Sequence, residues 1–157
     1  MLVLPIDDYL HGLAEMPVSW HPEALRAQAI AGRSYAVYRA IDRENAVFDV
    51  FDSVQDQVYA GFDAKSAGRV TAADSSSNLV VTVDDQIVQT FYSSSNGGYT
   101  ESTENSSSFG TAQPWHISKP DPFDLAPDED GDPRNPFAFK RFEFTVEEVS
   151  RWLANYS

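Results

Sequence analysis

The longest regular pattern in the chain lies between residues 22 and 43. Pro22 suits the first position of a helix, no proline follows it in this stretch, and small residues surround the helix on nearly every side. We expect one long helix here that packs closely against its neighbours at the centre of the fold. Arg33 is the exception in it, a long cation within a run of small residues.

Three shorter helices are expected, one before this stretch and two after it. Residues 6–14 favour a short helix that ends near Glu15-Met16-Pro17, because proline disfavours helical geometry in the residue before it. Residues 64–76 favour a weaker helix. Residues 145–155 favour a helix capped by Thr145, with Glu148 at the capping-box position.

Period-two alternation predicts the strands. Residues 79–83 and 86–93 alternate on both sides of Asp84-Asp85, which predicts a hairpin. Further strands are expected over residues 46–51, 56–60 and 137–144. Residues 102–135, which are rich in Ser, Pro, Asp and Gly, are expected to be mostly loop.

These elements predict an α+β protein in which a central small-residue helix packs on mostly antiparallel strands with long polar loops. The chain has 157 residues, which fits one domain with a hydrophobic core. No internal repeat and no inter-domain linker is visible. We therefore expect a single domain over residues 1–157.

The charge balance excludes some classes of partner. The formal net charge is −13, from 11 basic and 24 acidic residues. This opposes binding to nucleic acid or to anionic lipid surfaces, which depends on clustered Lys and Arg, but it allows a neutral carbohydrate. No apolar run is long enough to span a membrane, and we expect no signal peptide within this chain. With no cysteine, thiol nucleophiles and thiolate metal sites are excluded.

Glu15 is the first candidate for chemistry. It is a single acidic residue between apolar neighbours, just before Met16-Pro17. Apolar surroundings disfavour the carboxylate, so we expect a raised pKa, and a carboxylic acid protonated near neutral pH can donate a proton to a leaving group. The alternative interpretation is an ordinary turn carboxylate that caps the backbone.

Two other groups of polar residues are unusual. Arg33 needs an anionic partner or a ligand on a tightly packed helix, and the structural alternative is an ion pair with Asp49 or Asp52. Arg26, two turns earlier, is expected to be more exposed. Alternation places Tyr92, Ser94 and Asn96 on one face of a strand, a row of hydrogen-bonding groups with an aromatic ring on which a sugar could stack.

Other kinds of site have little support. The three histidines are scattered, and there is no Gly-x-Ser-x-Gly motif and no glycine-rich phosphate loop. The acidic run over residues 128–132 has too few alternating ligand positions for a calcium loop, and we interpret it as a surface turn.

Several motifs, in order, resemble one family. Ala14-Glu15-Met16-Pro17, the helix segment 23–36, Gln57-Val58-Tyr59 and the segment 91–101 are similar to the SpoIID/LytB domain of the sporulation stage II protein D family. Asp121-Pro122-Phe123-Asp124 resembles the family's Asp-Pro-Tyr-Asp element. Several separate motifs in the family's order are more specific than any one of them.

The resemblance implies a lytic transglycosylase that acts on peptidoglycan glycan strands in the bacterial cell envelope, outside the cytoplasm. Glu15 would be the general acid and then the base, and the product would carry a 1,6-anhydro ring. The implied substrate-binding residues are Arg26, Arg33, Gln57, Tyr59, Tyr92, Ser94, Ser95, Asn96 and Gly97. Some members bind zinc through His-Cys before Gln-Val-Tyr, but these positions are Gln55 and Asp56 here, so no metal or other cofactor is expected.

Three other functions stay open at this point. Some relatives are described as modifiers of a cell-wall amidase, so the domain could bind glycan or enhance such a partner without catalysis. A plain hydrolase would release reducing ends without the anhydro product. The last alternative is an acidic α/β domain without activity.

Overall fold

The chain forms two compact units, Met1–Tyr92 and Ser93–Ser157. The computed structural model describes residues 1–62, 66–105, 111–127, 130, 135, 137 and 143–155. Its helices are α1 (Ile6–His11), α2 (Pro22–Asp42), α3 (Ala67–Ser75) and α4 (Val146–Ala154), with a 3₁₀ helix η2 (Thr103–Asn105). Two strands, β1 (Thr82–Val83) and β2 (Gln86–Ile87), form an antiparallel sheet. The α+β class is confirmed.

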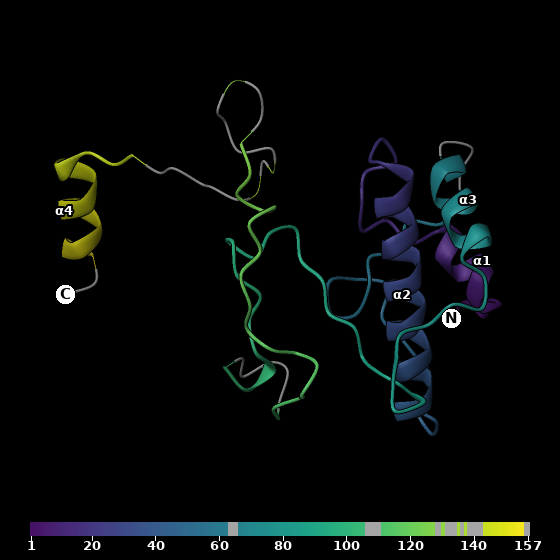
Figure 1. Ribbon diagram of the computed structural model, residues 1–157. Helices are drawn as coiled ribbons and strands as arrows, with labels where there is room; N and C mark the ends of the chain where they lie inside the picture. Colours follow the sequence, from purple (N-terminus) through teal and green to yellow (C-terminus); the bar gives the residue numbers. More distant parts are fainter. Residues whose placement is uncertain are drawn as a thin grey trace. The chain divides into compact units, whose positions relative to one another are not determined.

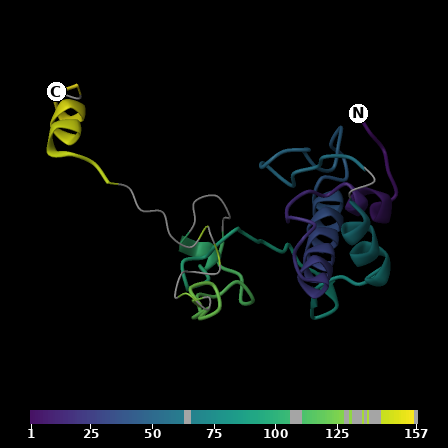
Figure 2. The ribbon, with the colours of Figure 1, turned by 90° about the horizontal axis from the view of Figure 1, so that it is seen from above.

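Helix α2 is the centre of the first unit. Figures 1 and 2 show α1 and α3 beside it, and all three helices contact one another. Their shared core consists of Leu10, Leu13, Leu25, Ala29, Ala72 and Ala73, with Tyr9 and Met16 packed against it. The predicted central small-residue helix is therefore present, and its small side chains allow the two shorter helices to approach closely.

Local sequence signals explain where the helices begin. Pro22 opens α2 as predicted, and the His21 side chain accepts a hydrogen bond from the Glu23 amide. Helix α4 begins after a capping box in which Thr145 and Glu148 each bind the other's backbone amide. Both predicted helix starts are confirmed.

Gly32 lies where α2 meets two other segments. A Cβ atom at this position would lie 2.6 Å from Cδ2 of Leu13 and 3.3 Å from Nε2 of Gln57. Both neighbours are buried. The absence of a side chain at residue 32 thus lets Leu13 and Gln57 pack directly on the backbone of α2.

The predicted hairpin is present but short. Asp84 and Asp85 both have positive φ angles, 49° and 60°, as the two central residues of a type I′ turn require. Only Thr82–Val83 pairs with Gln86–Ile87. Beyond the sheet, the Val88 amide still donates to the Val81 carbonyl, while the Val81 amide donates to the Ser34 hydroxyl of α2.

Two strand predictions are wrong. Residues 46–51 form a loop, in which the Phe51 amide donates to the Asp56 carboxylate and Arg43 donates to the Asp49 carbonyl. Residues 56–60 contain only a single bridge, between Tyr59 and Leu13. The predicted strand 137–144 and the acidic run 128–132 lie largely outside the described residues.

The residues of the second unit that the structure describes lie mostly in loops, as predicted within residues 102–135. Its described part contains η2, α4 and a bridge between Tyr99 and Pro120. None of the helices in the described part of the chain is long and apolar enough to cross a membrane.

Candidate functional site

Glu15 lies at the end of a short backbone ladder. The Ala14 amide donates to the Val58 carbonyl at 2.8 Å, and the Ala60 amide donates to the Gly12 carbonyl at 2.9 Å. In an antiparallel pair the Val58 amide would return a bond to the backbone of Ala14. It donates instead to Oε1 of Glu15 at 2.6 Å. A backbone group therefore fixes one carboxylate oxygen of this half-buried side chain.

A buried amide lies next to this contact along the chain. Gln57 has 0% of its surface exposed. Its Nε2 donates to the Gly32 carbonyl at 3.2 Å and to the Tyr92 hydroxyl at 2.8 Å, while its Oε1 accepts from the Tyr9 hydroxyl at 3.0 Å. Gln57 thus ties together α1, α2 and the segment that leads to Tyr92.

The two tyrosine hydroxyls share an electrostatic environment with Glu15. Burial raises the pKa of Tyr9, and the charges of Tyr92 and Glu15 add to this shift. Burial also raises the pKa of Tyr92; a hydrogen bond from Gln57 opposes this shift, and the charge of Glu15 adds to it. Both hydroxyls therefore stay protonated at neutral pH. Gln57, which directly precedes Val58 in the chain, links the Tyr92 hydroxyl to the segment whose amide binds Glu15.

Tyr59 belongs to the backbone ladder, where it pairs with Leu13, and its ring lies next to Gly12. Its ring stacks on Tyr9, with the centroids 5.5 Å apart and the planes within 5°. A Cβ atom at Gly12 would lie only 2.3 Å from this ring, so the glycine makes room for it. Tyr59 is half-buried, and the sugar contact implied for it stays a prediction.

Arg33 is buried and bound by protein groups. It is 2% exposed, and its five N–H groups are directed at Asp7 and at the carbonyls of Ala73, Ser76 and Leu79. The structural alternative, an ion pair, is present, and the substrate contact of Arg33 stays a prediction. Its ionic partner is Asp7, not Asp49 or Asp52. The hydrogen bond from Arg33 lowers the pKa of Asp7, and a second one from Ser77 adds to this.

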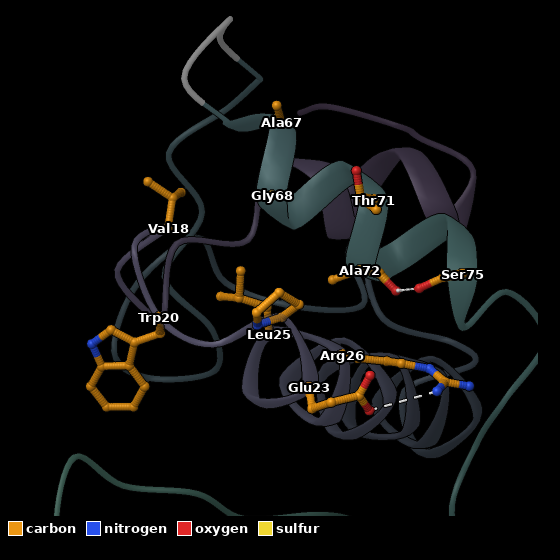
Figure 3. A pocket seen from close by; sticks show the side chains of 11 residues that line it. Val18, Trp20, Glu23, Leu25, Arg26, Ala67, Gly68, Thr71, Ala72 and Ser75 are labelled. Carbon is orange, nitrogen blue, oxygen red and sulfur yellow. Dashed lines mark hydrogen bonds and ion pairs between the residues drawn. The ribbon is translucent and has the colours of Figure 1, made fainter.

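Arg26 lines a groove whose lining does not include Glu15. Figure 3 shows this groove between α2 and α3, with Val18 and Trp20 at one end. Its volume is about 470 Å³. The Arg26 side chain is 41% exposed, and its Nη1 lies 3.7 Å from a Glu23 carboxylate oxygen. The expectation that Arg26 is more exposed than Arg33 is confirmed, and its substrate contact stays a prediction.

Asp56, at one of the positions where some family members have zinc ligands, is held by cations. Its side chain is 1% exposed and lies 2.9 Å from Nη1 of Arg43 and 3.2 Å from Nε of Arg39. Burial raises the pKa of Asp56, but hydrogen bonds from the Phe51 amide, Tyr35 and Arg43 outweigh it, so the pKa is lowered. Asp56 thus organises the loop before Gln57.

In the second unit, the loop after Tyr92 is held by the Asp-Pro-Phe-Asp motif. One oxygen of Asp124 accepts from the Ser95 hydroxyl at 2.6 Å and from the amides of Asn96, Gly97 and Gly98 at 3.1, 2.8 and 3.3 Å. The Ser95 bond is the main reason that the pKa of Asp124 is lowered. This anchoring role of the motif was not predicted from the sequence.

The side chains of this loop differ in how far they are engaged. Asn96 donates to Asp121 at 2.8 Å, and its Oδ1 accepts from the Gly98 amide. The carbonyl of Ser94 accepts from Asn135, while the residue itself is exposed. The hydroxyl of Ser95, the amide of Asn96 and the backbone of Gly97 thus shape the loop. Their sugar contacts, like that of Ser94, stay predictions.

Sequence reasoning also missed two contributors to the Glu15 site. Tyr9 was not singled out in the sequence, and only the structure shows that its hydroxyl donates to Gln57. Backbone amides carry no signal in the sequence, so the bond from Val58 to Glu15 could not be predicted. Gln57 has no exposed surface and holds other residues in place here, and its substrate contact stays a prediction.

Comparisons with known proteins agree with the motif order. A family model described as Stage II sporulation protein, SpoIID, matches residues 1–104. An uncharacterized protein of Brachyspira hyodysenteriae is 36% identical over 115 residues, 71% of this chain and 31% of that protein. The amidase enhancer of Bacillus subtilis is 34% identical over 107 residues, 68% of this chain and 14% of its own.

The stage II sporulation protein D of Bacillus subtilis is more distant, 26% identical over 118 residues, which are 64% of this chain and 34% of that protein. This chain therefore spans about a third or less of each of these relatives. The family model nevertheless covers the Glu15 ladder, the whole of α2 and the Gln57 segment. The chain belongs to the SpoIID family.

Proposed function

We propose that this chain is a lytic transglycosylase that cleaves peptidoglycan glycan strands in the bacterial cell envelope. Glu15 protonates the glycosidic oxygen between N-acetylmuramic acid and N-acetylglucosamine. The carboxylate that results takes the proton of the muramyl 6-hydroxyl, whose oxygen attacks C1 as the glycosidic bond breaks. The product is a 1,6-anhydro ring, and no water is consumed.

The observation that carries this proposal is the bond from the Val58 amide to Oε1 of Glu15. An amide N–H needs an acceptor, so in the protonated acid the proton resides on Oε2. The acid is thereby fixed in one orientation, with a defined oxygen to deliver and recover the proton. Geometry of this kind is the first requirement for a general acid and base.

A single carboxylate suffices for this reaction. Ordinary glycosidases use two, one as the acid and the other as the nucleophile or base. The other buried acid described above, Asp56, is bound by Tyr35, Arg39 and Arg43 and supports the loop. An intramolecular attack by the 6-hydroxyl, which needs one group acting twice, matches a site organised around Glu15.

The test is digestion of purified glycan strands without stem peptides, with mass spectrometry of the products. We expect anhydro-terminated fragments from the wild type and a loss of at least about 100-fold in Glu15→Gln. The glutamine still accepts from the Val58 amide, so its thermal stability should match the wild type. Glu23→Gln, at an exposed acid on α2, serves as the control and should stay active.

Two results would contradict the proposal. Full activity in Glu15→Gln would remove its catalytic role. Products with reducing ends, heavier by one water than the anhydro fragments, would identify a hydrolase instead.

A second function has support from one relative, whose name is amidase enhancer. In this version the chain binds glycan and raises the activity of a cell-wall amidase without cleaving the strand itself. The wild type would then yield no glycan fragments alone, yet would accelerate peptide release when it is added to an amidase. Glu15→Gln would keep that effect.

A further inference from the structure

The amide of Gln57 has a direction that its partners dictate. A main-chain carbonyl can only accept, so the group facing the Gly32 carbonyl at 3.2 Å must be the NH₂ of Gln57. Its second hydrogen is then directed to the Tyr92 hydroxyl, and Oε1 is left for Tyr9. The backbone of α2 therefore sets the orientation of the whole chain of hydrogen bonds.

This direction makes the two tyrosines unequal. Tyr9 gives its only hydroxyl proton to Gln57. Tyr92 accepts from Gln57, so its own proton points elsewhere. Tyr92 thus has a proton to donate, and its hydroxyl is bound by the residue that directly precedes Val58, whose amide binds Glu15.

We propose that Tyr92 donates a hydrogen bond to the acetamido carbonyl of an N-acetylated sugar, and that Gln57 is the positioning residue that directs this proton. An amide oxygen is the strongest neutral acceptor that such a glycan offers. The inference deepens the proposed function, on which it rests, by naming the chemical group that the Glu15 site recognises.

The first test compares binding of tri-N-acetylchitotriose and of its fully de-N-acetylated form by calorimetry. We expect Tyr92→Phe to weaken binding of the acetylated probe about tenfold, the value of one hydrogen bond of about 1.4 kcal/mol, with little effect on the other probe. Tyr35→Phe is the matched control: its hydroxyl donates to Asp56, so both affinities should be unchanged.

The second test reverses the direction of the hydrogen bonds. In Gln57→Glu the side chain keeps its shape, but at neutral pH an ionised carboxylate accepts the proton of Tyr92. We expect this variant to lose the preference for the acetylated probe as fully as Tyr92→Phe does. At a pH low enough to protonate the introduced carboxylate, the preference should return, which a merely structural role would not produce. If this variant does not fold, Tyr92→Phe decides the question.

The outcomes separate this inference from the proposed function. Should the wild type bind the acetylated probe in a Tyr92-dependent way yet cleave no glycan, the inference stands and the catalytic proposal fails. Should the wild type cleave glycan while Tyr92→Phe binds and cleaves equally well, the inference is overturned alone. An absence of both binding and cleavage in the wild type would overturn both.

Discussion

The two buried faces of α2 treat polar groups in opposite ways. On the face toward α3, Arg33 has a partner for each of its five N–H groups. On the face toward Gln57, the Gly32 carbonyl orients the Gln57 amide so that it donates to the Tyr92 hydroxyl, which leaves the proton of Tyr92 for another acceptor. Residues 32 and 33 are neighbours in the sequence but lie on different sides of α2, because successive positions on a helix are rotated by about 100°.

The difference separates structure from chemistry. A buried cation whose donors are all satisfied is stable in one arrangement and has no capacity left for a ligand. A network that ends in a hydroxyl with an uncommitted proton keeps that capacity. Arg33 looks more unusual than Gln57 in the sequence, yet all of its donors are occupied by protein groups.

The largest expected loss of stability comes from replacing Arg33, on the face of α2 toward α3. Arg33→Met removes the cation beside Asp7 and takes the Arg33 hydrogen bond from each of three carbonyls, those of Ala73, Ser76 and Leu79. The first two of these carbonyls keep a bond from a backbone amide. The Asp7 side chain is 37% exposed, so the loss comes mainly from the buried hydrogen bonds of the Arg33 guanidinium. A hydrogen bond to a charged group contributes about 1.5–3 kcal/mol, so removing several of them should lower the free energy of unfolding in urea by about 3 kcal/mol or more, or leave no folded protein. Arg26→Met is the matched control, because its exposed pair with Glu23 should contribute less than about 1 kcal/mol.

The comparison between the two arginines is decisive. Equal and small losses would show that the bonds of Arg33 add little to the folded state. A loss of glycan cleavage in Arg33→Met at unchanged stability would support the substrate contact predicted for Arg33.

The sequence predicted what depends on local signals. Helix α2 was expected over residues 22–43 and ends at Asp42, because Pro22 starts it and no breaker interrupts it. The need of Arg33 for an anion was also predicted from its small neighbours. Its partner was not, because Asp7 is 26 residues away and reaches Arg33 only through the packing of α1.

The wrong strand predictions have a similar cause. Residues 46–51 alternate like a strand, but Asp56 binds the Phe51 amide and Arg43, which curls the segment into a loop. Such side-chain bonds to the backbone compete with strand pairing and leave no period-two signal. The family motifs located Glu15 and Gln57, but the full burial of Gln57 depends on tertiary packing.

A smaller loss of stability is expected from replacing Gly32, which precedes Arg33 on α2. In Gly32→Ala the new methyl group would lie 2.6 Å from Cδ2 of the buried Leu13. Overpacking costs about 1–3 kcal/mol, and the better helix propensity of alanine returns up to about 1 kcal/mol, so a net destabilisation is expected. Urea unfolding of Gly32→Ala, Leu13→Ala and the double variant measures it. The double variant should lose less than the sum, because Leu13→Ala removes the clash; strict additivity would contradict this packing.

The smallest effect concerns Tyr35, the tyrosine of α2 whose hydroxyl bonds to Asp56. Burial and the bond to Asp56 raise the pKa of Tyr35 from 10.0 to about 12. A group with a raised folded-state pKa stabilises the fold fully below its unfolded value, and this contribution is lost as the pH rises from about 10 to 12. Tyr35→Phe should cost about 1 kcal/mol at neutral pH for the lost bond and then decline less steeply than the wild type between pH 10 and 12. Urea unfolding across this range tests it, since two parallel curves would mean that Tyr35 does not titrate differently in the folded state.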